Sequence, residues 1–166
     1  MFDKLKTPSD AFMFKLGSAL KMENKVLGML GDLEEEASRD ELKQQFRHHA
    51  EETRQHVRNV EQAFQMLGEE PDDKINLVIE AIEKEGKANI KMADEALVDN
   101  VLLAGAEATE HHEIATYEWL IANAQALGHQ DVVPLLQQNL ESEQHTLDEV
   151  RRAAKRLARE TAGAAA

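Results

Sequence analysis

Apolar residues recur every three or four positions along four long stretches of this 166-residue chain, which is the spacing of one face of an α-helix. The stretches cover residues 8–36, 38–68, 88–127 and 131–160, with short breaks between most of them. The chain has only three prolines, and its aromatic content is 4%. This composition favours long helices over a many-stranded sheet. The sequence therefore predicts an all-α protein built from four long helices.

Capping signals mark the ends of these helices. Residues 7–10 (Thr-Pro-Ser-Asp) and 38–41 (Ser-Arg-Asp-Glu) both match the pattern of a helix start. In this pattern the capping side chain and an acidic side chain three residues later bond to each other's backbone N–H groups. Gly68 and Gly128 are placed to end the second and third long helices, because glycine readily adopts the left-handed conformation that follows a helix. Asp131 is placed to cap the fourth.

The connection between the second and third long helices is longer than the other two and includes a shorter amphipathic stretch, residues 72–86. The two short loops predict two antiparallel hairpins, and the long connection predicts a crossover between them. We therefore expect one domain over residues 1–160, a four-helix bundle with a crossover that carries a short extra helix. Residues 161–166 are expected to form a disordered tail.

The charge of the chain limits its partners. The formal net charge is −13, whereas nucleic acids and anionic lipid surfaces attract basic proteins. There are no cysteines, so disulfides, thiolate metal sites and cysteine nucleophiles are excluded. No window approaches the eighteen consecutive apolar residues of a membrane span. We expect a cytoplasmic protein that binds neither nucleic acid nor membrane.

Each long helix places glutamate on its otherwise apolar face. The residues are Glu23, Glu52, Glu110 with Glu113, and Glu143. One glutamate of each helix lies about 14 to 16 residues from the nearest hairpin loop, which is roughly 20–25 Å at the rise of an α-helix. Glu110 lies about one turn from Glu113. We therefore expect these carboxylates to meet near the middle of the bundle.

Buried carboxylates that approach one another need a counter-charge to remain ionised. No lysine or arginine occupies the apolar faces at that height, so one or two metal ions would supply it, and the ligand types suit iron or manganese. His56, one turn after Glu52, is the candidate nitrogen ligand. His49 is expected to support the site or to pack in the core, and at most one of His111 and His112 can point inward. The alternative is that each glutamate lies at the edge of its stripe, but four helices agree in face and height.

Three segments also carry a family resemblance. They are residues 49–64, residues 110–117 (Glu-His-His-Glu-Ile-Ala-Thr-Tyr) and residues 140–146. Together with Glu23, they resemble the YciE/YciF family of ferritin-like bacterial stress proteins over about residues 8–158. The resemblance implies a ferritin-like bundle, often a dimer, with a di-metal site.

The resemblance places metal ligands at the inward glutamates, with residue 56 beside them. The paired glutamates Glu110 and Glu113 are also similar to those of rubrerythrin. The sequence departs from the usual ferritin-like Glu-x-x-His pattern, because Gln55 and Thr146 stand three residues after Glu52 and Glu143. A site poor in histidine is therefore expected.

Three functions remain open on these residues. The first is a di-iron or di-manganese redox centre that acts on oxygen or peroxide, with Glu110 or Glu113 as the mobile ligand. The second is metal binding without catalysis. The third is a metal-free helical dimer that binds a protein partner through its acidic exterior. For the first we expect two metal ions and a small oxidant as partners, and a homodimer as the assembly.

Overall fold

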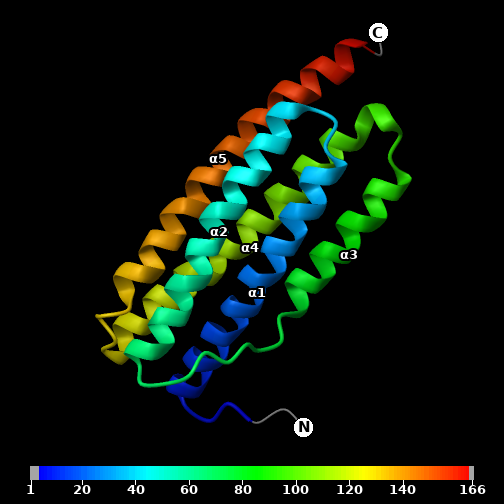
Figure 1. Cartoon of the computed structure of the whole chain (residues 1–166). Helices are drawn as coiled ribbons and strands as arrows, with labels where there is room; N and C mark the ends of the chain where they lie inside the picture. The colour runs from blue at the N-terminus through cyan, green and yellow to red at the C-terminus, as the bar shows by residue number, and fades with distance from the viewer. Residues whose placement is uncertain (1–3, 165–166) are drawn as a thin grey trace.

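The computed structural model describes residues 4–164, and over this range it contains five α-helices and one short 3₁₀ helix. In chain order they are α1 (Pro8–Glu36), α2 (Asp40–Met66), α3 (Leu77–Met92), η1 (Glu95–Leu97), α4 (Val98–Leu127) and α5 (Val133–Ala164). Figure 1 shows α1, α2, α4 and α5 as a bundle, with α3 lying along its outside. The predicted all-α, ferritin-like bundle with a helix in its crossover is confirmed.

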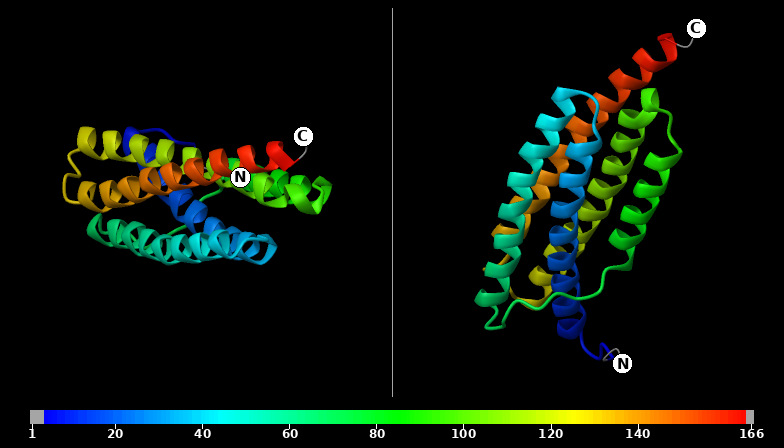
Figure 2. Two further views of the ribbon diagram at one scale, coloured as in Figure 1. Left: turned by 90° about the horizontal axis from the view of Figure 1, so that it is seen from above. Right: turned by 45° about the vertical axis from the view of Figure 1, so that its right-hand side comes forward.

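The bundle consists of two antiparallel hairpins. Figure 2 shows the α1–α2 hairpin packed against the α4–α5 hairpin, and α3 beside α1 and α4. Because the chain passes through α3 between the hairpins, α2 and α4 run in the same direction (Figure 1). The glutamates of all four bundle helices can therefore face a common interior.

The two predicted capping boxes behave differently. At the start of α1, Asp10 N donates to Thr7 Oγ1 at 3.0 Å, and Thr7 N donates to Asp10 Oδ2 at 2.9 Å, as expected. The box predicted at Ser38 is wrong, because the residue that precedes α2 is Arg39 and its side chain makes no capping bond. Ser38 instead donates to buried Asp99 of α4, from its N–H at 2.8 Å and from its hydroxyl at 2.6 Å. A tertiary contact thus replaces the local cap.

The boundaries of the crossover helix were also wrong. We expected a helix ending at Gly86 and a long helix beginning near residue 88, but α3 continues through Gly86 to Met92. Asn76 caps α3, since its Oδ1 accepts from Ile79 N at 3.1 Å. The chain breaks at Ala93, where the backbone is extended, and then reverses through η1 into α4. Glycine inside a helix costs only about 1 kcal/mol, so Gly86 alone does not end it.

The last helix is longer than expected. α5 continues to Ala164, whereas the sequence predicted a disordered tail from residue 161. The Thr161 hydroxyl lies 2.9 Å from Leu157 O and 3.1 Å from Asn100 Oδ1 of α4 and can donate its one hydrogen to either, and the contact with Asn100 attaches this turn to the bundle. Residues 165 and 166 of the predicted tail lie outside the described residues.

The segment that leads from α2 to α3, residues 67–76, is called the strap here, and it crosses α1 at Gly17. Lys74 N donates to Gly17 O at 3.0 Å, and a Cβ added at Gly17 would lie 2.4 Å from the backbone oxygen of Asp72. The absence of a side chain at residue 17 is therefore what lets the strap lie on the helix.

Replacing Gly17 with alanine should lower stability, because the backbone of the strap must move. We expect a loss of about 1–3 kcal/mol, read as a lower denaturation midpoint in urea. Gly28→Ala is the matched control on the same helix, because a Cβ there meets nothing within 4 Å. The control should gain about 0.5–1 kcal/mol from the better helix propensity of alanine. Equal effects of the two substitutions would contradict the close crossing.

The bundle interior is apolar at both ends and polar in the middle. Above and below the middle it is filled by large buried side chains, among them Phe12, Leu16, Leu30, Phe46, Leu103 and Leu136. Most of the buried charged residues gather at mid-height instead, and Asp99, which bonds to Ser38, lies near one end. Within residues 4–164, no helix combines the length and the apolar character that a membrane span requires.

Candidate metal centre

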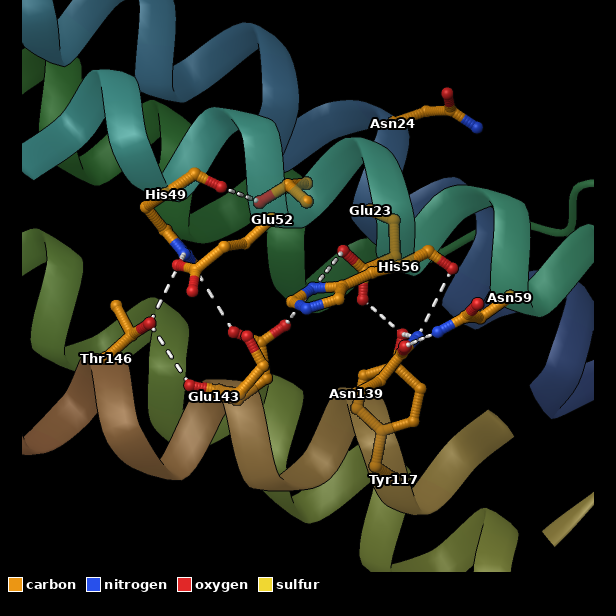
Figure 3. Close-up of polar contacts among 12 residues, drawn as sticks. Glu23, Asn24, His49, Glu52, His56, Asn59, Tyr117, Asn139, Glu143 and Thr146 are labelled. Carbon is orange, nitrogen blue, oxygen red and sulfur yellow. Dashed lines mark hydrogen bonds and ion pairs between the residues drawn. The ribbon is translucent and has the colours of Figure 1, made fainter. Parts of the chain in front are cut away.

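Six ionisable side chains meet in the middle of the bundle, and every bundle helix supplies at least one. They are Glu23 of α1, His49 and His56 of α2, Glu110 and Glu113 of α4, and Glu143 of α5. Each is at most 4% exposed. Figure 3 shows how the residues from α1, α2 and α5 point toward one another. The expected convergence at one height is found for the carboxylates of α1, α4 and α5, whereas α2 contributes two histidines and not the expected Glu52.

The first half of the cluster contains His49, Glu110, Glu113 and Glu143. Ligand atoms of these four residues all lie within 4.8 Å of one another, close enough to hold one metal ion. His49 Nε2 lies 3.3 Å from Glu110 Oε1 and 3.8 Å from Glu143 Oε2. This half therefore offers three carboxylates and one imidazole.

The second half contains Glu23, His56 and Glu143, which could hold a second ion. His56 Nδ1 lies 2.8 Å from Glu143 Oε1 and 3.6 Å from Glu23 Oε2. Glu143 belongs to both halves, and its two oxygens face different histidines: Oε1 lies near His56 and Oε2 near His49. A carboxylate in this position can bridge two ions.

The cluster is short of hydrogen bonds. Eight of its buried side-chain atoms have no hydrogen-bond partner, including both oxygens of Glu113 and both oxygens of Glu143. His56 Nδ1 is among them although Glu143 Oε1 is only 2.8 Å away, so the two groups are close but not aligned for a hydrogen bond. Buried polar atoms are rarely left without partners. The lone pairs converge on shared space, as the ligands of a cation do.

Burial and mutual repulsion hold protons on the carboxylates. Burial raises the pKa of Glu113 well above its usual value, and the nearby charges of Glu143, Glu23 and Glu110 raise it further. Burial also raises the pKa of Glu143, which reaches about 7 although His56 acts in the opposite direction. Protons thus fill part of the role that cations could fill.

Burial and the neighbouring carboxylates also shift the pKa values of the two histidines. Burial lowers the pKa of His56, but Glu143 and Glu23 outweigh burial and raise it to about 10. For His49, burial again lowers the pKa, and the carboxylates of Glu110 and Glu52 raise it well above its ordinary value. Both imidazoles therefore act as counter-ions for the carboxylates when no metal is bound.

A hydrogen-bonded chain holds one side of the cluster in place. The hydroxyl of Tyr117, itself fully buried, donates to Glu23 Oε1. Asn139 Nδ2 donates to the Tyr117 hydroxyl at 2.8 Å and to the backbone oxygen of His56 at 3.2 Å. Asn59 Nδ2 donates to Asn139 Oδ1 at 2.7 Å. These bonds, visible in Figure 3, fix Glu23 and the helix turn that carries His56.

On α5, Thr146 occupies the position where a ferritin-like site has a histidine ligand, and it contacts His49 of α2. This residue stands three positions after Glu143, where the ferritin-like Glu-x-x-His pattern has histidine. Its hydroxyl lies 3.3 Å from His49 Nδ1 (Figure 3). The imidazole of the first half thus comes from α2, and the shorter threonine leaves room for it.

Glu52 lies differently from what we expected. It is half-buried and belongs to neither group of converging ligand atoms. Its Oε2 lies 3.4 Å from His49 Nδ1, and its Oε1 lies 3.7 Å from Nε2 of exposed His48. Glu52 therefore contacts the outer nitrogen of His49 while the inner nitrogen faces the cluster. Its role as a metal ligand is not supported by this arrangement.

His49 is a cluster residue that the sequence pattern did not identify as a ligand. Its spacing from His56 is seven residues, or about two helical turns, so both point to the same side of α2. Glu52 lies roughly 40–60° away from that side at 100° per residue. Neither His111 nor His112 joins the cluster: His111 contacts Arg151 at 2.8 Å and is exposed, and His112 contacts Asn76 at 3.2 Å.

Comparison with known proteins agrees with this architecture. The family described as a domain of unknown function, DUF892, matches residues 7–163. The chain belongs to the DUF892 family. The curated relative Protein YciF of Escherichia coli K12 is 29% identical over 144 residues, which cover 86% of this chain and 87% of YciF. The predicted membership of the YciE/YciF family is thereby confirmed.

Solved structures of similar proteins share the fold. YcfI of Rhodopseudomonas palustris, described as a structural protein, is 31% identical with a TM-score of 0.88, over 91% of this chain and 98% of YcfI. The E. coli stress protein YciF is 28% identical with a TM-score of 0.84, over 93% of this chain and 99% of YciF. A protein of Xanthomonas campestris, at 21% identity and a TM-score of 0.72 over 92% of this chain and 94% of that protein, shares the fold.

Proposed function

We propose that this DUF892 protein binds two iron or manganese ions in the mid-bundle cluster and uses them to react with dioxygen or peroxide. The observation that carries the proposal is the position of Glu143. Its two oxygens face two separate groups of buried ligand atoms, and neither oxygen has a hydrogen-bond partner.

The charges of the cluster fit two divalent ions. Glu23, Glu110, Glu113 and Glu143 carry four negative charges when ionised, and two divalent cations with neutral histidines balance them. Carboxylate oxygen and imidazole nitrogen are donors that suit iron and manganese, and the chain has no cysteine to favour a thiolate site. Redox-active ions in this position would supply the electron transfer for reduction of a small oxidant.

The protein's own residues divide the remaining tasks. Glu143 joins the two halves, and Tyr117 holds Glu23 by its hydroxyl. Neither Glu113 oxygen has a hydrogen-bond partner, whereas Glu110 approaches His49 at 3.3 Å. Of the two candidates for a mobile ligand, Glu113 is therefore the better choice, because its movement does not break a close contact with an imidazole such as the one that Glu110 makes with His49. Burial of the whole cluster limits the access of water.

Metal analysis tests the proposal directly. Protein from cells supplemented with iron or manganese should retain two ions per chain after gel filtration, and the loaded protein should consume peroxide or dioxygen catalytically. Retained metal without turnover would support the proposed metal binding and contradict the proposed reaction with dioxygen or peroxide. The same gel filtration measures whether the chain is the homodimer that we propose.

Chelation distinguishes this proposal from a metal-free helical protein with a partner-binding role, to which YcfI's description as structural gives some weight. A ligand bound only by the native state, at a free concentration of about 100 times its Kd, adds about 2.7 kcal/mol to stability. For a chain of this size that raises the Tm by roughly 5–10 °C. Equal Tm values with and without a chelator would favour the metal-free alternative.

The hydroxyl of Tyr117 should matter for one ion more than for the other. In Tyr117→Phe, Glu23 loses its hydrogen-bond donor, and we expect the ion held by Glu23 and His56 to bind about 10–100-fold more weakly. The ion held by His49, Glu110 and Glu113 should remain. A metal titration followed by calorimetry separates the two affinities. Trp119→Phe, at a 38% exposed position of the same helix, is the control and should leave both unchanged.

The description of E. coli YciF as a stress protein also supports a role against oxidants. We propose the cytoplasm as the location of this chain and an oxidant-stress response as its setting. Survival of a deletion strain under peroxide, with and without the Glu143→Gln variant supplied in trans, measures that role in the cell.

A further inference from the structure

A small cavity lies directly beside the cluster. Its volume is about 10 Å³, and His49, Glu110 and Thr146 form one side of it. Leu30, Phe46, Ala106 and Val150 supply an apolar wall from all four bundle helices. A cavity of this size holds about one water-sized molecule. The cavity is therefore a place where a very small molecule can lie next to the ligand atoms.

A larger hollow opens on the surface, and Gln45 lies between it and the small inner cavity. It lies between α2 and α5 and has a volume of about 450 Å³. Its lining is polar and comprises Gln44, Gln45, Glu149, Arg152, Ala153 and Arg156. Gln45 also lines the inner cavity, and it is the residue that the two spaces share. The side chain of Gln45 thus stands between solvent and the cluster.

The amide of Gln45 is not held in its place by hydrogen bonds from the protein. Its Nε2 is buried and has no hydrogen-bond partner. A buried amide nitrogen without an acceptor loses hydrogen-bond energy, and an oxygen-containing guest can restore it. We propose that Gln45 gates a channel between α2 and α5, through which a small neutral oxidant, dioxygen or hydrogen peroxide, reaches the His49–Glu110 side of the centre. This inference rests on the proposed function.

The surroundings of the channel select its occupant. The inner cavity is narrow and mostly apolar, which admits only a very small neutral molecule and disfavours a hydrated ion. At the outer hollow, Arg156 pairs with Glu41 at 2.8 Å, and Arg152 and Glu149 both line the space, so the lining carries no excess negative charge that would attract a metal cation. The channel therefore suits a neutral oxidant better than an ion.

Binding of nitric oxide to the ferrous protein tests the gate without turnover. Nitric oxide is a diatomic probe, and its binding is followed by stopped-flow absorbance. Gln45→Phe should slow the bimolecular rate at least about tenfold, equivalent to about 1.4 kcal/mol of barrier, and Gln45→Ala should raise it severalfold. The controls Gln62→Phe and Gln62→Ala, at an exposed position of α2, should match wild type. Equal rates in all variants that hold iron would overturn the channel.

Xenon provides a second test that needs no metal. In metal-free crystals of Gln45→Ala under xenon pressure, we expect a xenon atom beside Phe46 and Val150, because apolar cavities of sufficient size take up xenon. Crystals of Gln62→Ala should show none there. Absence of xenon from both would overturn the channel. Wild-type protein that retains no iron would contradict the proposed function, and the xenon result then decides the channel alone.

Discussion

Replacing Glu143 with glutamine is expected to abolish the binding of both metal ions. Glu143 is the residue that belongs to both groups of ligand atoms, and each of its oxygens faces one of the two histidines. Glutamine keeps the size of the side chain but removes its negative charge and puts an NH₂ group where one oxygen stood. Metal content after gel filtration should fall from two ions per chain to none.

Two further variants show whether this effect is specific. Glu141→Gln, at an exposed position of α5, should retain both ions. Glu52→Gln should also retain both, because Glu52 contacts the outer nitrogen of His49 and not the cluster interior. Full occupancy in Glu143→Gln would contradict the shared-ligand arrangement. Complete loss in Glu52→Gln would show that Glu52 moves inward to bind metal.

Much of the fold can be predicted from local signals in the sequence. Apolar spacing identifies a helix because burial of one face is the main force that stabilises it. Gly68 and Gly128 both adopt positive φ, at 79° and 82°, and both follow the helices that they were predicted to end. Local signals of this kind predicted four bundle helices and the crossover.

The errors in the fold have non-local causes. Ser38 bonds to Asp99, which lies 61 residues away in the sequence, and no pattern around residue 38 reports that partner. The break at Ala93 follows from the need of the chain to reverse between α3 and α4. Gly86 carries a local signal for a helix end, but it lies within α3 and a Cβ added there meets nothing within 4 Å.

The candidate site was predictable to the extent that helix geometry fixes it. Height and face bring Glu23, Glu113 and Glu143 together, because both depend only on residue counts along regular helices. The choice between Glu52 and His49 depended on a rotation of α2 about its axis, which the apolar stripe leaves uncertain by tens of degrees. The seven-residue spacing of His49 and His56 was the available signal.

The pH dependence of stability should differ between metal-free and metal-loaded protein. In the metal-free protein, the folded-state pKa of His56 is about 10 and that of His49 is raised, so both hold protons that the unfolded chain releases near 6.5. Their contribution to stability is present in full below pH 6.5 and is lost as pH rises toward the folded-state values. From pH 7 to 9, His56 should contribute a slope of about −1.4 kcal/mol per pH unit. His49 contributes in the same direction, as do Glu113 and Glu143, whose raised pKa values also keep protons that the unfolded chain releases.

Metal binding should remove this slope, because an imidazole that binds metal is already deprotonated and proton competition weakens as pH rises. The pKa of His112 is lowered to about 4, so this residue makes stability rise with pH only below about pH 6.5, which is outside this window. Urea unfolding at pH 7, 8 and 9 gives the slopes. Metal-free His56→Gln should lose one histidine's share, whereas His48→Gln, at an exposed position, should not. Parallel slopes for loaded and metal-free protein would mean that the ions do not replace protons on the two histidines.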